Sequence, residues 1–483
     1  MIRIQTNNIN AKKQRGKQGI CLLKGFGFLP GILLSFLLLL GLSACAGTPV
    51  PIPVAPVEPI INIEEPPVPI EGIVAEEKTV IEEKEPRELI LRLFPNNAKV
   101  MANGEPLEPI RRENDLAWYL TSATQLGIES NNYAPLSLFL PEMKDVPAEE
   151  VVILEAKLEA ENLPLELETE LPTGIQPKSV RFSSDGKYLY VAHLAQTGAI
   201  SRYKVEPFEL DAQWNVPESW AEDKGFVETL LLPERGELWV TQMTRDVVHV
   251  FDSKSGLWLE AIETDGSWPK VLALSPDKTM VYISCWVSQS ISEIDVDKRK
   301  VTRKFSVSGI PRGLAFSPNG EELLVTIFSS SAIDRINLKS GKLTESHIPV
   351  ENTKYAMRHI VWDKYKKIYY ITAMGKKRVY KMTPEGVFSG YWDVGEKPNT
   401  CAISPDGNWL FVSCRGPNNP DKGYLVEGYE YGKVYIINLK TDSIQGWIWG
   451  RDQTTGLDIS PDGRWLAFTD FLDQNLEIYR INP

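Results

Sequence analysis

Hydrophobic and polar residues alternate in short runs that recur about every forty residues through the C-terminal two thirds of the chain. The clearest copy occupies residues 268–309, where an apolar run to Leu274 is followed by alternating runs at Met280–Ser284, Ile291–Val296 and Val301–Val307. Alternation over such short runs indicates β-strands. Four short strands separated by tight turns, repeated at a period of about 40 residues, predict a β-propeller.

A turn-forming tetrapeptide separates the first two predicted strands in every copy. Its fullest form is Ser-Pro-Asp-Gly, in which proline presets φ and the Asp-Gly pair fills the turn and left-handed positions. We interpret these residues as conformational, and not as a nucleophile or a metal-binding loop. The seven copies begin at Ser183, Pro233, Ser275, Ser317, Trp362, Ser404 and Ser460.

The two ends of the array predict how the ring closes. The seventh copy ends with Leu476–Ile481, so it has a third strand and lacks a fourth. An alternating run at Leu163–Leu171 precedes the first copy. We therefore predict a seven-bladed β-propeller whose last blade is completed by this N-terminal strand, because such closure leaves no open sheet edge.

The first 44 residues have the pattern of an export signal. They contain six basic and no acidic residues, and an apolar run spans 26–42. Residues 42–45, Leu-Ser-Ala-Cys, resemble a bacterial lipobox, in which the cysteine is lipidated and becomes the mature N-terminus; an ordinary signal peptide and a membrane-anchor helix are the alternatives. We predict export and a lipid anchor at Cys45. The non-acidic Ala46 favours the outer membrane, on its periplasmic or surface side.

Two segments separate the predicted anchor from the propeller, which occupies 161–483. Residues 45–87 are rich in Pro, Glu, Val and Ile, which predicts a solvated tether. Residues 88–160 contain alternating runs and an Asn-Gly hairpin signal at 103–104, so we predict a small β-sandwich-like domain there. The stretch 94–135 resembles a PEGA-type β domain, which implies a structural spacer or a small ligand-binding module.

Composition limits the class of partner. The chain has 52 basic and 64 acidic residues, and removal of the predicted signal with its six basic residues leaves 46 against 64, or −18. An acidic protein argues against nucleic acid or an anionic membrane as the main partner, so the lipid anchor is the predicted link to the membrane.

Three of the five cysteines, Cys285, Cys401 and Cys414, lie beyond the export region, and this odd number predicts free, mostly buried thiols.

The propeller repeat resembles a known family. The stretch from Pro269 to Asp295, with its Leu-Ser-Pro-Asp turn and Val-Tyr-Ile-Ser strand, is similar to the YVTN (YncE-like) β-propeller repeat. The copies with turns at Ser317 and Ser404 fit nearly as well. The resemblance implies the fold, since related seven-bladed propellers include lactonases, amine dehydrogenase subunits and non-enzymatic surface or periplasmic proteins.

Basic residues recur where the chain begins the first strand of several copies. Lys178, Lys270 and Arg312 hold equivalent positions in copies one, three and four, and Arg358 is expected one position later in copy five. In a propeller these positions surround one mouth of the central tunnel. A basic ring there predicts a site for a carboxylate or phosphate group. The alternative is that these residues are rim charges paired with neighbouring acids.

Aromatic residues mark the same predicted face. Trp268 and Trp286 flank it in copy three, and copy six carries an insertion, residues 416–431, between its second and third strands. Extra length on a binding face is a functional signal, and exposed Trp and Tyr suit sugar stacking or a protein interface. The insertion contributes three candidate ligand-binding tyrosines: Tyr424, Tyr429 and Tyr431.

No catalytic set emerges from the sequence. Of four histidines, only His193 and His359 are predicted to face the tunnel, from different copies, so we predict no metal site. CxxCH and HExxH motifs are absent, which excludes covalent c-type haem and zincin chemistry. A calcium-dependent lactonase needs a Glu/Asn/Asp set, of which Asn399 and Asp470 supply part. We predict no cofactor.

We therefore expect an all-β cell-envelope lipoprotein whose propeller binds or scaffolds an envelope protein or glycan. The alternative is a lactonase-like hydrolase with its site at the tunnel mouth, and a quinone-cofactor dehydrogenase subunit is a third hypothesis. Whether the chain is an enzyme stays open, with binding the favoured role.

Overall fold

The computed structural model describes residues 2–8, 86–140, 150–347 and 356–482. The predicted lipidation site Cys45 and all of the predicted tether except its last two residues lie outside the described residues. Residues 2–8 fall within the predicted signal peptide and form strand β1 (Ile2–Asn8) at the edge of a sheet.

Seven four-stranded antiparallel sheets follow one another in the described part of the chain from Leu165 to Ile481. We number them one to seven from β11 to β37. The first strands are β11 (Pro177–Phe182), β15 (Phe226–Leu232), β19 (Pro269–Leu274), β23 (Pro311–Phe316), β27 (Met357–Asp363), β31 (Pro398–Ile403) and β35 (Thr454–Ile459). The second strands are β12 (Tyr188–His193), β16 (Glu237–Gln242), β20 (Met280–Cys285), β24 (Glu322–Ile327), β28 (Ile368–Ala373), β32 (Trp409–Cys414) and β36 (Trp465–Asp470).

The third and outer strands complete each sheet. The third strands are β13 (Gly198–Lys204), β17 (Val247–Asp252), β21 (Ser290–Asp295), β25 (Ala332–Asn337), β29 (Arg378–Met382), β33 (Lys433–Asn438) and β37 (Asn475–Ile481). The outer strands are β14 (Glu209–Asn215), β18 (Trp258–Glu263), β22 (Lys300–Ser306), β26 (Leu343–His347), β30 (Phe388–Asp393), β34 (Ser443–Trp449) and β10 (Leu165–Pro172).

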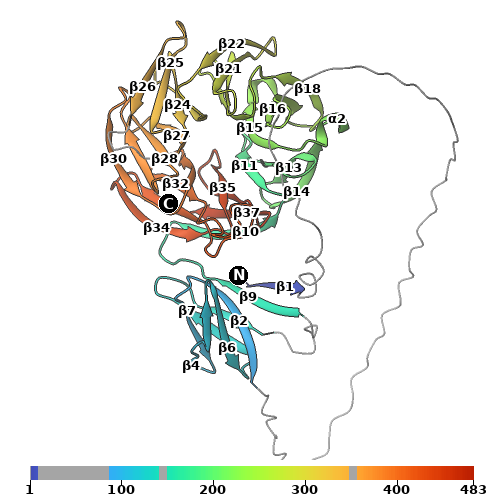
Figure 1. Cartoon of the computed structure of the whole chain (residues 1–483), viewed down its shortest axis with the longest axis vertical. Coiled ribbons are helices and arrows are strands. Elements are labelled where there is room, and N and C mark those ends of the chain that lie inside the picture. The colour runs from blue at the N-terminus through green and yellow to red at the C-terminus, as the bar shows by residue number, and fades with distance from the viewer. Residues whose placement is uncertain (1, 9–85, 141–149, 348–355, 483) are drawn as a thin grey trace, which may run out of the picture. The chain divides into compact units, whose positions relative to one another are not determined.

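The first strands form a closed ring. Each lies beside the first strands of the neighbouring sheets, and β35 lies beside β11. Figure 1 shows β11, β15 and β35 near the middle of this ring and β14, β30 and β34 at its periphery. Second and third strands such as β20 and β21 are almost wholly buried because both of their faces pack against adjacent sheets, whereas the outer β22 is mostly exposed. This arrangement is that of a β-propeller.

An N-terminal strand closes the ring, as the sequence predicts. In sheet seven the strand order is β10-β37-β36-β35, and β10 pairs antiparallel with β37 from Leu165 opposite Ile481 to Pro172 opposite Asn475. The first and last parts of the propeller are therefore hydrogen-bonded to each other. This pairing occupies the edge of β37 that would otherwise be open.

The repeated turns have the conformational role that the sequence predicts. In the Ser275 turn, Ser275 Oγ donates to Asp277 Oδ1 at 2.6 Å and accepts from the Met280 backbone N–H at 2.9 Å. The turns at Ser183, Ser317, Ser404 and Ser460 repeat this pair of bonds with Asp or Asn two residues later. The Pro233 turn instead forms a 3-10 helix, Pro233–Arg235 (η2), capped by Gly236 at φ 65°.

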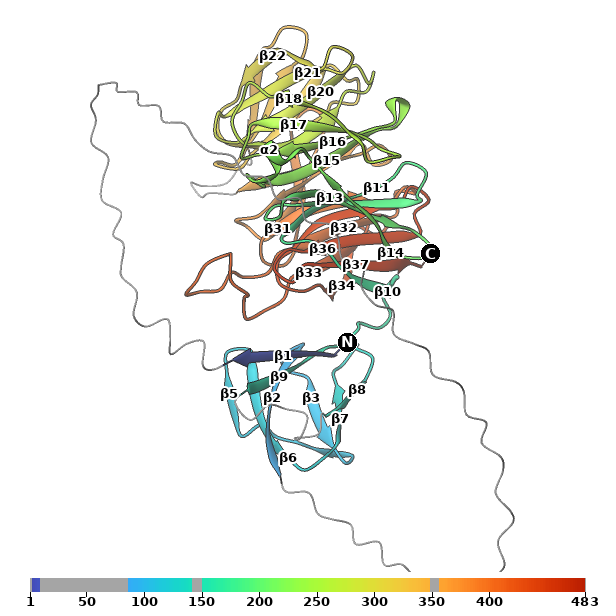
Figure 2. The ribbon, with the colours of Figure 1, turned by 90° about the vertical axis from the view of Figure 1, so that its right-hand side faces the viewer.

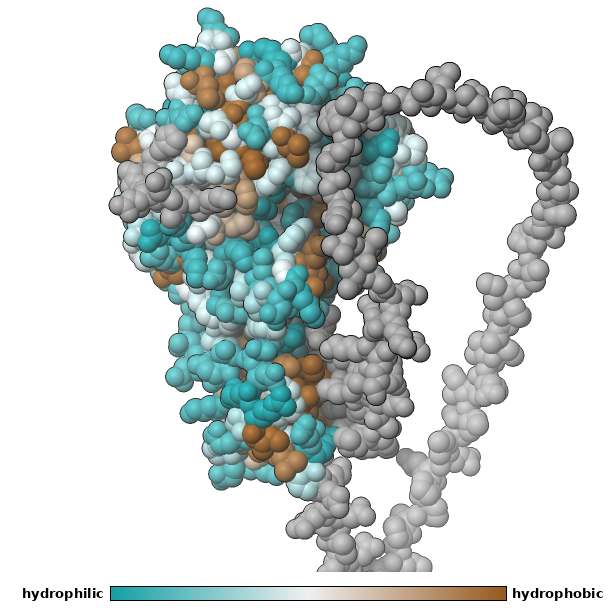
Figure 3. Space-filling view, in the orientation of Figure 1, coloured by the Kyte–Doolittle hydropathy of each residue, from teal (hydrophilic) through white to brown (hydrophobic). Residues whose placement is uncertain are grey.

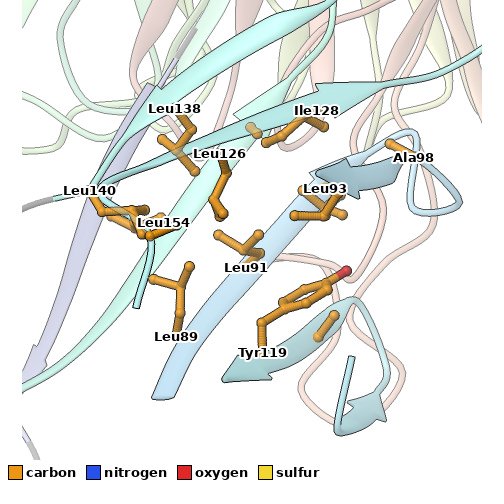
Figure 4. Packing of buried hydrophobic residues seen from close by; sticks show 14 of the residues in the cluster. Leu89, Leu91, Leu93, Ala98, Tyr119, Leu126, Ile128, Leu138, Leu140 and Leu154 are labelled. Atoms are coloured by element: carbon orange, nitrogen blue, oxygen red, sulfur yellow. The ribbon is translucent and has the colours of Figure 1, made fainter. Parts of the chain in front are cut away.

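A small β domain precedes the propeller and consists of two sheets with strand orders β1-β9-β2-β6-β5 and β4-β3-β7-β8. Leucines from both sheets point toward one another in its core (Figure 4), among them Leu91, Leu126 and Leu138, which are fully buried. Its further strands are β2 (Arg87–Phe94), β3 (Lys99–Ala102), β4 (Glu105–Pro106), β5 (Arg111–Glu113), β6 (Leu116–Thr121), β7 (Gln125–Glu129), β8 (Leu136–Phe139) and β9 (Glu150–Lys157).

The small domain and the propeller belong to one compact unit. Lys157, at the end of β9, donates to both carboxylate oxygens of Glu477 at 2.8 and 2.7 Å, and both side chains are buried. The Phe94 ring stacks on Tyr431 with centroids 3.8 Å apart. The contact between the small domain and the propeller thus consists of a buried ion pair and an aromatic cluster.

Helix is scarce in the described residues. A single helical turn, Glu218–Ala221 (α2), lies between β14 and β15. No described helix is long and apolar enough to cross a membrane.

Candidate functional site

The second residue of the first strand is basic in four of the seven propeller sheets. Lys178, Lys270, Arg312 and Arg358 hold this position in β11, β19, β23 and β27. The expectation that Arg358 lies one position further along was wrong, because Met357 pairs with Ala373 in the register that Pro269 has with Cys285. The ring of first strands therefore brings four cations from four sheets to one mouth of the tunnel.

A fifth cation, Arg415, joins them and was missed from the sequence. It is the first residue after β32, and the same position in sheets three and seven holds Trp286 and Phe471. A search of the residue following each second strand would have found it. We call Lys178, Lys270, Arg312, Arg358 and Arg415 the cation ring.

The members of the cation ring repel one another. Burial is the main cause that lowers the pKa of Lys178 well below its usual range, and repulsion by the other four cations adds to this shift. Burial, with repulsion from Arg312 and Arg358, lowers the pKa of Lys270 to about 7. Burial also lowers the pKa values of Arg312 and Arg415 to about 10. The site thus holds more positive charge than its surroundings stabilise.

None of the five forms an ion pair with a carboxylate among the described residues. Arg358 Nε donates to Asn399 Oδ1, and Arg415 donates to Gln453 Oε1. Arg312 is buried, and its Nη1 has no hydrogen-bond partner in the structure. Glu228, the acid whose charge acts on Arg312 and Arg358, lies 3.9 Å from Arg181. The alternative that these residues are rim charges paired with neighbouring acids is therefore not what the structure shows.

Aromatic side chains stand beside the cation ring. Lys270 Nζ lies 5.0 Å from the Trp268 ring centroid and 5.9 Å from that of Trp286, and Arg312 Cζ lies 5.9 Å from the same Trp286 centroid. Lys178 Nζ lies 4.5 Å from the Phe471 centroid. At such distances a cation is attracted by the negative face of an aromatic ring.

The insertion in sheet six places one of its three tyrosines at the cation ring. Arg415 Cζ lies 5.8 Å from the Tyr424 ring centroid, and Gln453 bridges Arg415 to the Tyr424 backbone carbonyl. Tyr424 is half exposed, and Tyr429 is partly buried. Tyr431 is buried against Phe94 of the small domain, so its ring faces a protein contact and not the tunnel mouth. Figure 2 shows the insertion as the orange-red loop that precedes β33.

A cavity of about 280 Å³ lies within the ring of first strands and is lined by Lys178 and by polar groups from other sheets. Some of its polar groups contact one another, whereas Ser179 Oγ and Arg181 Nε have no hydrogen-bond partner in the structure. Arg181 Nη1 donates to Asp458 Oδ1 at 3.4 Å, and His359 Nδ1 lies 3.5 Å from Cys401 Sγ. Burial lowers the pKa of His359 to about 3, so the imidazole is neutral at physiological pH.

The expected lactonase residues have other contacts. Asp470 Oδ1 accepts from Thr454 Oγ1 at 2.8 Å and from the Arg451 backbone N–H at 3.0 Å, which ties a strand end to a loop. Asn399 is engaged by Arg358. The described residues contain no group of three or more His, Cys, Asp or Glu side chains placed to hold a metal ion. Cys285, Cys401 and Cys414 are free and buried, as predicted.

Comparison with known proteins shows similarity to a relative by sequence and to solved structures by fold. No family model matches the chain. It is 38% identical over 321 residues to Antigen Lp49 of Leptospira interrogans, a match that covers 64% of this chain and 68% of that protein. Solved structures of a Kuenenia stuttgartiensis hydrazine synthase and a Staphylococcus aureus virginiamycin B lyase each align with a TM-score of 0.54.

These two structural matches cover 65% of this chain and 98% and 99% of the matched chains, at 18% and 15% identity. At such low identity these matches show the propeller fold, and they give no evidence about the function of this chain. The sequence match to the antigen is stronger and spans more than two thirds of its length. The chain belongs to the family of the Leptospira Antigen Lp49.

Proposed function

We propose that the chain is an exported envelope lipoprotein whose seven-bladed propeller binds an anionic group of an envelope protein or glycan at the cation ring. The observation that carries this proposal is the convergence of five cationic side chains from five sheets without an ion-paired carboxylate. A buried charge without a counter-charge is costly, so an anionic ligand would supply the counter-charge that the protein lacks at this site.

The chemistry of the donors fits this role. Three arginines present planar forks suited to oxyanions, and each charge-assisted hydrogen bond to a ligand contributes about 1.5–3 kcal/mol. The Arg312 Nη1 group, buried and without a partner, is available for such a bond. In the view of Figure 3 the hydrophobic residues form small separate patches on a hydrophilic surface, which favours polar recognition over a broad apolar interface on the face shown.

The envelope location follows from the sequence of the N-terminal region. The Leu-Ser-Ala-Cys stretch at 42–45 predicts lipidation of Cys45, and the relative is named an antigen, as expected of an exported or surface protein. Cleavage before Cys45 would remove β1, which occupies an edge of its sheet. We propose that the remaining strands of the small domain keep their pairing after cleavage.

The test is recovery of envelope components on immobilised protein that begins at residue 46. We expect the wild-type protein to retain partners that the double variant Arg312→Gln/Arg415→Gln loses. The matched control is Lys364→Gln, which removes a cation whose neighbour Tyr365 is an exposed residue of a strand-joining turn. Equal recovery by the double variant and the wild type would refute the proposal. Turnover of lactone substrates that depends on Arg312 would instead favour the hydrolase hypothesis.

A further inference from the structure

The site offers two kinds of contact side by side, and together they define a ligand class. The cation ring supplies donor groups from five basic side chains on five sheets, whereas a single carboxylate needs one or two donors. Phosphate carries up to two negative charges and three terminal oxygens, which suits donors arriving from several directions. The number of donors and the several directions from which they arrive thus favour a phosphoryl group over a carboxylate.

Trp268 presents an indole at the edge of the cation ring in a costly conformation. Its φ of 60° is in the left-handed region, which costs a bulky residue on the order of 1–2 kcal/mol. The Trp268 N–H donates to Asp246 Oδ1 at 2.7 Å, and its carbonyl accepts from the Trp286 N–H at 2.9 Å, so both sides of the residue are held. The residue before the first strand also has a positive φ in five other sheets, at Gln176, Gly225, Ala356, Lys397 and Gln453, so this conformation belongs to the repeat. The contacts of Trp268, and not its backbone conformation, associate it with the cation ring.

The Trp268 side chain is nevertheless not part of the core. It is 42% exposed and lies beside Lys270, whereas the similarly exposed Tyr424 lies beside Arg415. An exposed indole beside cations can stack on the apolar C–H face of a sugar. The interior cavity is a weaker place for the sugar, because the described residues that line it include no exposed aromatic ring comparable to Trp268 beside a cation.

We propose that the ligand group is a phosphorylated sugar, with its phosphate in the cation ring and its ring stacked on Trp268. This proposal rests on the proposed function and specifies its ligand. The buried Asn399 Nδ2, which has no hydrogen-bond partner in the structure and lies beside Arg358, supplies a donor for a sugar hydroxyl or a phosphate oxygen. Arg312 Nη1 supplies a second unpartnered donor.

The experiment is isothermal titration of the protein that begins at residue 46 with acetate, inorganic phosphate, glucose, glucose 1-phosphate and AMP at one pH. We expect phosphate to bind at least tenfold more tightly than acetate, and glucose 1-phosphate at least tenfold more tightly than phosphate. Glucose without phosphate should not bind measurably, because the cation ring then lacks its counter-charge.

Variants separate the two halves of the site. Trp268→Gly relieves the left-handed strain and should reduce glucose 1-phosphate affinity to that of phosphate while phosphate affinity is unchanged. Trp268→Phe, which keeps a ring, should restore part of the loss. Arg312→Gln should weaken phosphate and glucose 1-phosphate alike by tenfold or more.

Each outcome decides between hypotheses. If glucose 1-phosphate binds no better than phosphate and Trp268→Gly changes neither, the sugar assignment is overturned while anion binding stands. Tighter binding of AMP than of glucose 1-phosphate would assign the stacked ring to a nucleobase, and this result would also overturn the sugar assignment. Acetate binding as tightly as phosphate would overturn the phosphoryl assignment. If none of the anions binds, the proposed function itself fails.

Discussion

Lys270 is the residue of the cation ring whose charge changes near neutral pH. Its pKa of about 7 in the ligand-free protein results mainly from burial and then from Arg312 and Arg358. A bound anion favours the charged form and therefore raises this pKa. Affinity for an anion is then greatest below pH 7 and falls as the pH rises through the ligand-free pKa.

This linkage is measurable with sulfate, which does not itself titrate between pH 6 and 9. We expect sulfate affinity of the wild type to decrease severalfold, and at most tenfold per pH unit, above pH 7. Lys270→Met should bind more weakly at pH 6 and show a flatter profile, with Lys178 as the remaining titrating lysine in the ring. A wild-type affinity that stays constant from pH 6 to 9 would contradict the role of Lys270.

At the scale of elements, the turns and the site can be tested separately. The Ser275 turn lies between β19 and β20, whereas Lys270 of the site lies near the start of β19. Ser275→Ala removes a hydroxyl that bonds to Asp277 and Met280, so it should lower the free energy of unfolding by about 1 kcal/mol. Denaturant titration measures this loss, and sulfate binding should be unchanged. A binding defect in Ser275→Ala would show that the turn is coupled to the site.

The insertion has an anchor whose protonation depends on pH. Asp452 Oδ1 accepts from the Gly428 backbone N–H at 2.9 Å, and burial, with repulsion from Asp473 and Glu427, raises the pKa of Asp452 to about 8. The attraction of Arg92 opposes this shift without cancelling it. Folding favours the protonated form of the Asp452 carboxyl. The stability that this group contributes is therefore fully present below the carboxyl pKa of about 4 in the unfolded chain, and it is lost as the pH rises through about 8.

Asp452→Asn keeps a side-chain oxygen for Gly428 and removes the titrating charge. We therefore expect the variant to have a higher melting temperature than the wild type at pH 9, by several degrees, and a similar one at pH 4. Thermal unfolding followed by circular dichroism at the two pH values provides the measurement. A stabilisation of equal size at both pH values would show that charge is not the cause.

At the scale of the whole molecule, the buried pair Lys157–Glu477 joins the small domain to β37, the propeller strand with which the closing strand β10 pairs. Lys157→Met leaves the Glu477 carboxylate buried without this partner, so unfolding should become easier by about 3–5 kcal/mol. The double variant Lys157→Met/Glu477→Leu removes both charges and should recover much of the stability. Chemical denaturation of the two variants tests this coupling, and equal destabilisation by both would contradict it.

The strand pattern, the turns and the closure could be predicted from the sequence because each depends on local periodicity. The short run at Met280–Ser284 predicts a strand where β20 lies, and the Ser275 turn residues set their own backbone conformation. The unmatched strand at Leu163–Leu171 identified the partner of the last strand. The YVTN and PEGA resemblances remain predictions.

The composition of the site was decided by the tertiary structure. Arg358 takes the position held by Lys270 and Arg312 because Met357 pairs with Ala373 as Pro269 pairs with Cys285. Copy five lacks the Ser-Pro-Asp-Gly turn that marks this register in the sequence of the other copies. Arg415 reaches the ring because β32 ends one residue before it, and Tyr431 leaves the site because Phe94, more than 300 residues earlier, stacks on it. Sequence periodicity determines which residues form a sheet face. Only the closed ring of sheets determines which charges from distant sheets meet without a counter-charge.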